Sequence, residues 1–127
     1  MLAVRFLFLL FILSFIFSHF SPVIVTYGWI KKYEELFNQV SDIVGNKDKI
    51  KAEVIFLTHN EGKHEYNLRH SLPGEHLLWR PELQEDKISQ YGGKNIRYKH
   101  DLKAQYIKEW TELHDKIIPW NTIRYIF

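Results

Sequence analysis

The chain has 127 residues, of which 46% are hydrophobic and 25% charged, and it contains no cysteine. The missing cysteines exclude disulfide scaffolds, thiolate metal sites and a cysteine nucleophile. The formal net charge of +2 is too small to predict nucleic-acid binding, for which a clustered basic face is expected. We therefore expect no nucleic-acid partner.

Hydrophobic residues are concentrated at the start of the chain. Residues 1–30 hold 22 of the 58 hydrophobic residues and a single charged side chain, Arg5. As a helix, residues 2–20 would extend about 28 Å, close to the ~30 Å hydrocarbon core of a bilayer. The sequence therefore predicts a transmembrane anchor over residues 1–30 and a small α+β domain over residues 31–127.

A cleaved signal peptide is the alternative to this anchor, with residues 6–17 as its apolar core. The residues after Phe17 make poor cleavage sites, so a retained single-pass anchor is favoured. The lysines that follow residue 30 favour a C-terminal domain on the cytoplasmic or matrix side, but the orientation stays open. The predicted location is a bacterial or organellar inner membrane, with membrane lipid as one partner.

An amphipathic helix is predicted from Trp29 to Val44, where apolar side chains recur at spacings of three and four residues. Gly45 is placed to end it, and Ser21 and Pro22 are candidates to cap its start. Packing of the apolar face on the domain core is the default interpretation. A membrane surface or a partner helix are the alternatives.

A β-hairpin is predicted from residues 52–59 and 64–70, which alternate in polarity around the segment 60–63. We prefer a three-residue turn with Gly62 in the left-handed conformation, because it pairs Glu53 with Arg69. A two-residue turn would instead place His59 opposite His64.

The remaining elements follow from helix and turn signals. Residues 71–80 are predicted to be a loop, and Pro81 to begin a short helix through about Tyr91. The 3.6-residue period predicts a helix from Asp101 to Pro119, and residues 120–127 alternate like a terminal strand that joins a mixed or antiparallel sheet.

No pattern that predicts catalysis or a cofactor is present. The nearest candidates for metal ligands are His59, His64 and His70, but the first two converge only in the less favoured hairpin. The carboxylates are scattered along helix faces, and no nucleophile elbow or phosphate loop occurs. We therefore interpret these histidines as solvated, and we expect no cofactor, no metal and no catalytic residues.

The predicted function is that of a non-catalytic accessory or assembly subunit of a larger membrane complex. Its other subunits would be contacted by exposed aromatic side chains, for which the candidates are Trp29, Tyr33, Phe37, Trp120, Tyr125 and Phe127. One alternative is a membrane-tethered or exported ligand-binding domain with a pocket lined by His64, Tyr66, Trp79 and Trp110. A small metal-dependent enzyme that uses the hairpin histidines is the third hypothesis.

Overall fold

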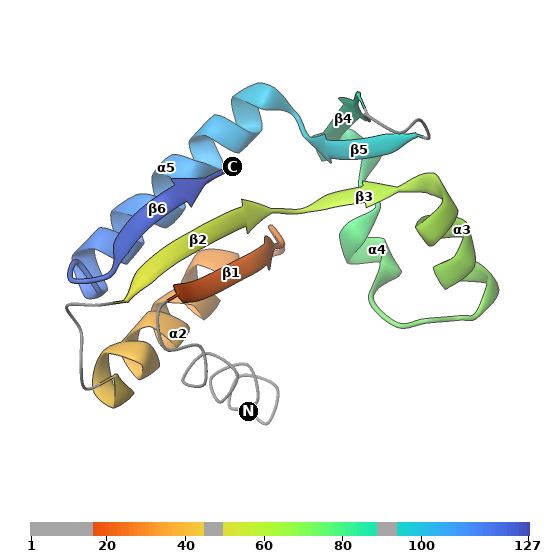
Figure 1. Cartoon of the computed structure of the whole chain (residues 1–127). Helices are drawn as coiled ribbons and strands as arrows, with labels where there is room; N and C mark the ends of the chain where they lie inside the picture. Colours follow the sequence, from red (N-terminus) through yellow and green to blue (C-terminus); the bar gives the residue numbers. More distant parts are fainter. Residues whose placement is uncertain (1–16, 45–49, 89–93) are drawn as a thin grey trace.

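A computed structural model describes residues 17–44, 50–88 and 94–127 of the chain (Figure 1). Helices and strands are mixed in this part of the chain, which confirms the predicted α+β class. The elements form two regions. One is a three-stranded sheet with two long helices, and the other is an insert over residues 58–98 that contains a second three-stranded sheet.

The first sheet is parallel and has the order β1-β2-β6. It consists of β1 (Phe17–Val23), β2 (Lys51–Phe56) and β6 (Thr122–Ile126). Parallel strands need crossover connections, which are usually helical. Here α2 (Trp29–Ile43) links β1 to β2, and α5 (His100–Ile117) leads into β6.

The core lies between this sheet and the two helices. Phe20 of β1 is in edge-to-face contact with Phe37 of α2 and with Trp110 of α5, at ring-centroid distances of 5.7 and 5.2 Å. Phe37 and Trp110 are themselves 5.2 Å apart, and both are fully buried. Because one strand residue touches both helices, α2 and α5 cover the same face of the sheet. The predicted amphipathic helix and its packing into the core are thus confirmed.

A buried polar network closes the end of this core. The imidazole Nε2 of His114 lies 2.9 Å from the amide oxygen of Asn121. The amide nitrogen of Asn121 donates to the backbone carbonyl of Ile50 at 3.0 Å and to the hydroxyl of Ser18 at 3.4 Å. Buried polar groups are normally paired in this way. The network therefore fixes α5 against the starts of β1 and β2.

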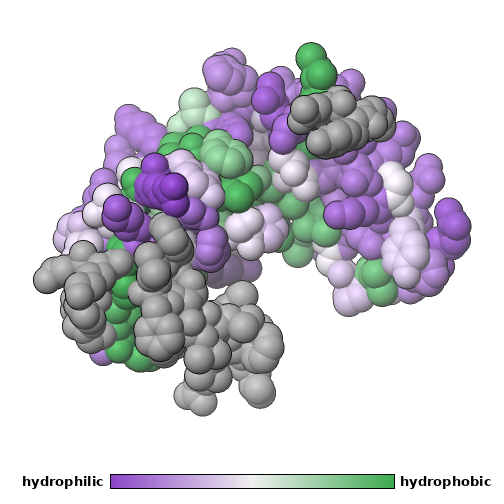
Figure 2. Space-filling model, in the orientation of Figure 1, coloured by the Kyte–Doolittle hydropathy of each residue, from purple (hydrophilic) through white to green (hydrophobic). Residues whose placement is uncertain are grey.

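The insert follows β2 and returns the chain to α5. It contains β3 (Thr58–Asn60), α3 (Glu61–Arg69), α4 (Glu75–Leu78), a 3-10 turn (Pro81–Leu83), β4 (Gln84–Lys87) and β5 (Asn95–Tyr98). Its strands are antiparallel, in the order β3-β5-β4. Helix α3 buries none of its side chains, and hydrophilic residues dominate the visible surface of the insert in Figure 2.

The expected membrane anchor is corrected by the structure. Residues 17–23 form β1, which pairs along its length with β2, so the predicted span does not continue as a helix to residue 30. Residues 1–16 lie outside the described residues. In the part of the chain that is described, no helix has the length and apolar character needed to cross a bilayer.

The predicted hairpin is also wrong. Strand β2 pairs with β1 and β6, which are distant in sequence, and residues 61–69 form helix α3 rather than a second strand. Asn60 caps this helix, with its side-chain oxygen accepting a hydrogen bond from the backbone N–H of Lys63 at 2.7 Å. Asn60, which was expected in the hairpin turn, therefore caps a helix instead.

Three smaller predictions also differ from the structure. The predicted loop 71–80 contains α4, and Pro81 begins a 3-10 turn that leads into β4 rather than a longer helix. Ser21 and Pro22 belong to β1, and Gly28 stands at the start of α2 instead. The last helix and the terminal strand are confirmed, although β6 joins its neighbour β2 in parallel.

Candidate metal centre

Three side chains from separate elements of the insert converge on one point. They are His59 of β3, His64 of α3 and Glu75 of α4. One potential ligand atom from each lies within 4.8 Å of the other two. Within the described residues this is the one group of three His, Cys, Asp or Glu side chains with such geometry.

Local structure explains why each side chain points inward. In β3, His59 is buried while its neighbour Thr58 is exposed, as expected for alternate strand residues. Glu75 begins α4 directly after Gly74, whose φ of 87° suits glycine. His64 and Asn67 are three residues apart on α3, so both face α4.

Glu75 is the centre of the group. One carboxylate oxygen, Oε1, lies 2.7 Å from Nε2 of His59 and 2.7 Å from Nδ1 of His64. The other oxygen, Oε2, accepts a hydrogen bond from the amide nitrogen of Asn67 at 2.6 Å. An ionised carboxylate only accepts hydrogen bonds, so both imidazole rings donate to it in this arrangement.

The electrostatics of Glu75 favour its charged form. Its side chain is only 5% exposed, and burial by itself would raise the pKa of the carboxyl. The hydrogen bonds from Asn67, His64 and His59 outweigh this and hold the pKa of Glu75 below its usual range. The centre therefore presents a buried carboxylate beside two imidazoles.

Trp79 forms a wall of the centre. Its indole stacks on the ring of His64, with centroids 4.4 Å apart and an interplanar angle of 9°, and lies edge-on to His59 at 6.1 Å. These contacts fix the planes of both rings. A site that holds its ligand side chains in place before the ligand arrives loses less conformational entropy on binding.

The structure brings two of the three candidate histidines together and leaves the third apart. His70 lies at the exposed end of α3, where its Nδ1 is 2.9 Å from the backbone oxygen of Tyr66 and its ring stacks on the Tyr66 ring.

The sequence pattern did not single out Glu75. Its one local signal was the preceding Pro73-Gly74 turn, which places the next residue at the start of a helix.

The side chains predicted to contact partners lie in the parallel-sheet region. Trp29 and Phe37 are buried, while Tyr33 and Trp120 are partly buried against the core. Tyr125 and Phe127 stack on each other at 5.2 Å, and Phe127 is 54% exposed. The pocket expected from four aromatic residues is not assembled, because Trp110 is in the core, whereas His64 and Trp79 lie in the insert and Tyr66 is exposed.

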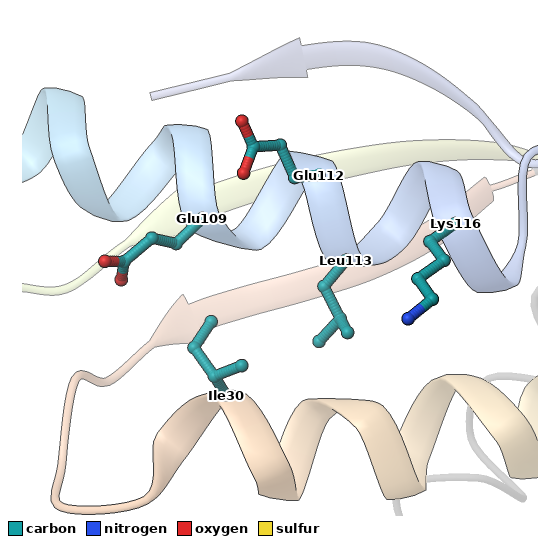
Figure 3. Close-up of a pocket in the computed structure, with 5 residues that line it drawn as sticks. All are labelled: Ile30, Glu109, Glu112, Leu113 and Lys116. Atoms are coloured by element: carbon teal, nitrogen blue, oxygen red, sulfur yellow. The ribbon is translucent and has the colours of Figure 1, made fainter.

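A separate groove of about 440 Å³ lies between α2 and α5 (Figure 3). Ile30 and Leu113 point toward each other across it, and Glu109, Glu112 and Lys116 also line it. All but Ile30 come from the single helix α5, and the groove brings no set of metal-ligating groups together. The centre in the insert is therefore the stronger candidate for a functional site.

Comparison with protein-family models and with curated protein sequences gives no match. Among solved structures, the fold is similar to that of spore photoproduct lyase. A complex of this lyase with dinucleoside spore photoproduct and a variant with bound AdoMet and the same photoproduct both match with a TM-score of 0.74 and 15% identity. The match covers 87% of this chain and 33% of the lyase chain, so this chain spans about a third of its length. At this identity the likeness shows a shared fold.

This comparison corrects the functional expectation. A single-pass, non-catalytic accessory subunit of a membrane complex was predicted, but the fold is one that occurs within an enzyme. The described residues also include no helix that could cross a membrane. The predicted single-pass localisation in an inner membrane is therefore not supported by the described residues.

Proposed function

We propose that this chain binds a divalent transition-metal ion of the zinc class through His59, His64 and Glu75. The observation that carries the proposal is the convergence of their three ligand atoms within 4.8 Å. Imidazole nitrogen and carboxylate oxygen are common ligands of Zn²⁺, at distances of about 2.0–2.2 Å. Two histidines and one carboxylate also form the ligand set of several known zinc sites.

The observed spacing is close to what such an ion needs. Ligand atoms around a tetrahedral ion at these bond lengths lie roughly 3.3 Å apart. Each imidazole nitrogen is 2.7 Å from Oε1 of Glu75, so each needs to withdraw by only about half an ångström. The ion would then replace two N–H···O hydrogen bonds with two metal–nitrogen bonds, and each ring proton would move to the other ring nitrogen or to solvent.

The weak hydrophobic packing of the insert supports the same proposal. Helix α3 buries no side chain, and Tyr66 and Leu68 on it are more than half exposed. Small structural units that cannot build an apolar core are commonly stabilised by a metal ion. An ion shared by β3, α3 and α4 would supply that stabilisation here.

The position of the centre is also typical of binding sites. His59 follows the carboxyl end of β2, the central strand of the parallel sheet. In open sheets with parallel strands, ligands bind beyond the carboxyl ends of the strands. In Figure 1 the insert extends from this edge of the sheet.

Calorimetric titration of the full-length chain with ZnCl₂, after treatment with EDTA, tests the proposal. A mild detergent keeps the apolar residues 2–20 in solution. We expect one ion per chain. We also expect His64→Ala and Glu75→Gln to weaken binding by about 100-fold or more, because each removes a ligand and the loss of an outer-shell partner alone costs about 10–100-fold.

His76→Ala is the matched control. His76 is the neighbour of Glu75 in sequence but is exposed, so its removal is expected to leave the affinity unchanged. Failure of the unmodified chain to bind one equivalent of zinc would overturn the proposal. It would then be simpler to regard Glu75 as a carboxylate held by three hydrogen bonds.

A further inference from the structure

We infer that the metal ion at this centre keeps one coordination position for a ligand from solution, namely water or a small anion with an oxygen or nitrogen donor. The inference rests on the proposed function and extends it. A site of this kind differs from a structural zinc site, in which the protein supplies all four ligands.

The number of protein ligands is the first observation. Within residues 17–44, 50–88 and 94–127, the group contains three side chains of the His, Cys, Asp and Glu classes and no fourth of these. The chain has no cysteine to complete the set. Zinc prefers four ligands, so three protein ligands leave one position for another molecule.

Asn67 limits which carboxylate oxygen of Glu75 can bind the ion. Its amide nitrogen donates to Oε2 of Glu75 at 2.6 Å, while both imidazoles meet Oε1. The hydrogen bond therefore occupies the second carboxylate oxygen and favours coordination through Oε1 alone. Asn67 acts here as a positioning residue, in the way that partners of metal ligands orient them in other proteins.

His64 is the most exposed of the three candidate ligands. The side chain of His64 is 20% exposed, whereas those of His59 and Glu75 are 6% and 5% exposed. Trp79 stacks on the His64 ring and so lies beside this more exposed side chain. We therefore expect a small ligand to approach from the side of His64.

The chemistry that follows is that of an ion with one exchangeable position. Such an ion binds water, and it can bind and polarise a carbonyl or phosphoryl oxygen that displaces the water. The class of ligand implied is therefore a small oxyanion or a carbonyl compound that can reach the His64 side of the centre.

Cobalt substitution gives a direct test, because the visible spectrum of Co²⁺ reports its ligands. The full-length chain is loaded with one equivalent of Co²⁺ and titrated with sodium azide and, separately, with acetohydroxamate. We expect the intense visible bands of a four-coordinate ion, and a saturable change in those bands with each anion.

The outcomes separate the two proposals. If Co²⁺ binds and its spectrum does not change at saturating azide, the open position is refuted while the metal site stands. If no protein-bound Co²⁺ spectrum appears, the metal site itself is refuted.

Variants add a second readout. Asn67→Ala frees Oε2 of Glu75 to bind the ion, so we expect the affinity for azide to fall by about tenfold while Co²⁺ still binds. His76→Ala is expected to match the unmodified chain in both titrations. An unchanged azide affinity in Asn67→Ala would overturn the positioning role of Asn67.

Discussion

In the parallel-sheet region, Phe20, Phe37 and Trp110 pack ring against ring in a buried core, whereas in the insert α3 buries no side chain and is held through His64 and Asn67. The first region is stabilised mainly by burial of apolar area, which needs no defined partner geometry. The second depends on a few directional contacts to one carboxylate. The apolar core and the proposed metal centre therefore lie in different parts of one short chain, and the predictions below test that division.

The largest effect is expected from Trp110→Ala. This side chain of α5 is fully buried against α2 and β1, so its removal leaves a large cavity. We expect the free energy of unfolding to fall by about 3–5 kcal/mol in urea denaturation. Tyr27→Ala, at a fully exposed position, is expected to change it by no more than about 0.5 kcal/mol. Similar losses in both variants would contradict the core described here.

A smaller and local effect is expected from Glu75→Gln. The neutral amide removes the negative charge that Asn67 and the two histidines meet, so their charge-assisted hydrogen bonds become weaker neutral ones. We expect a local loss of about 2 kcal/mol, measured as faster amide hydrogen exchange in α3. Amides of α2 and α5 should keep their protection. Equal acceleration in all three helices would mean that the two regions unfold as one unit.

Alkaline pH is expected to act through the buried phenol of Tyr33 on α2. Burial of Tyr33, with a smaller contribution from Tyr98, raises the pKa of its phenol well above the ordinary value of 10.0. Above pH 10 the unfolded chain ionises this group before the folded chain does, so stability is lost as pH rises, by roughly 1.4 kcal/mol per pH unit.

Tyr33→Phe should reduce that loss, measured as the difference in free energy of unfolding between about pH 9 and about pH 11. Tyr27→Phe, at the fully exposed position, serves as the control and should retain the full loss. A Tyr33→Phe variant with the same alkaline sensitivity as the unmodified chain would argue against burial of this phenol.

The smallest effect is expected from Asn60→Ala. Its side chain accepts the hydrogen bond from the backbone N–H of Lys63 that caps α3. Loss of such a cap costs about 1 kcal/mol, and amide exchange in the first turn of α3 should become faster by a corresponding factor. Asn60→Asp keeps the acceptor and should restore the protection. If it does not, the cap contributes little to this helix.

The same division explains what the sequence could predict. Helices α2 and α5 were found because each buries one face, which imposes a period of 3.6 residues on the apolar side chains. Helix α3 buries no side chain, so no such period exists, and the aromatic and leucine residues at 66 and 68 suggested a strand. Strand β2 was recognised from its alternation, but its partners β1 and β6 are far away in sequence.

The centre was only partly predictable for the same reason. His59 and His64 are two of the three candidates, with His70, yet their convergence depends on a helix that carries no periodic signal. Glu75 joins them only because α4 folds back against α3, a contact that neither segment indicates alone. A carboxylate in a segment that looks like a loop is indistinguishable in sequence from a solvated one.

Pairing of β3 with β5 has a consequence for the order in which the chain folds. Strands β2 and β6 are neighbours in the sheet, but residues 57–121 separate them, and closing a long loop carries an entropic cost that slows folding. The antiparallel pairing of Thr58 with Arg97 brings the end of β2 close to the start of α5. Once this pair forms, the residues between β2 and α5 no longer add to the length of the loop that must close before β2 and β6 can pair. Early formation of the insert is therefore expected to lower the entropic cost of pairing β6 with β2 and to speed this step of folding.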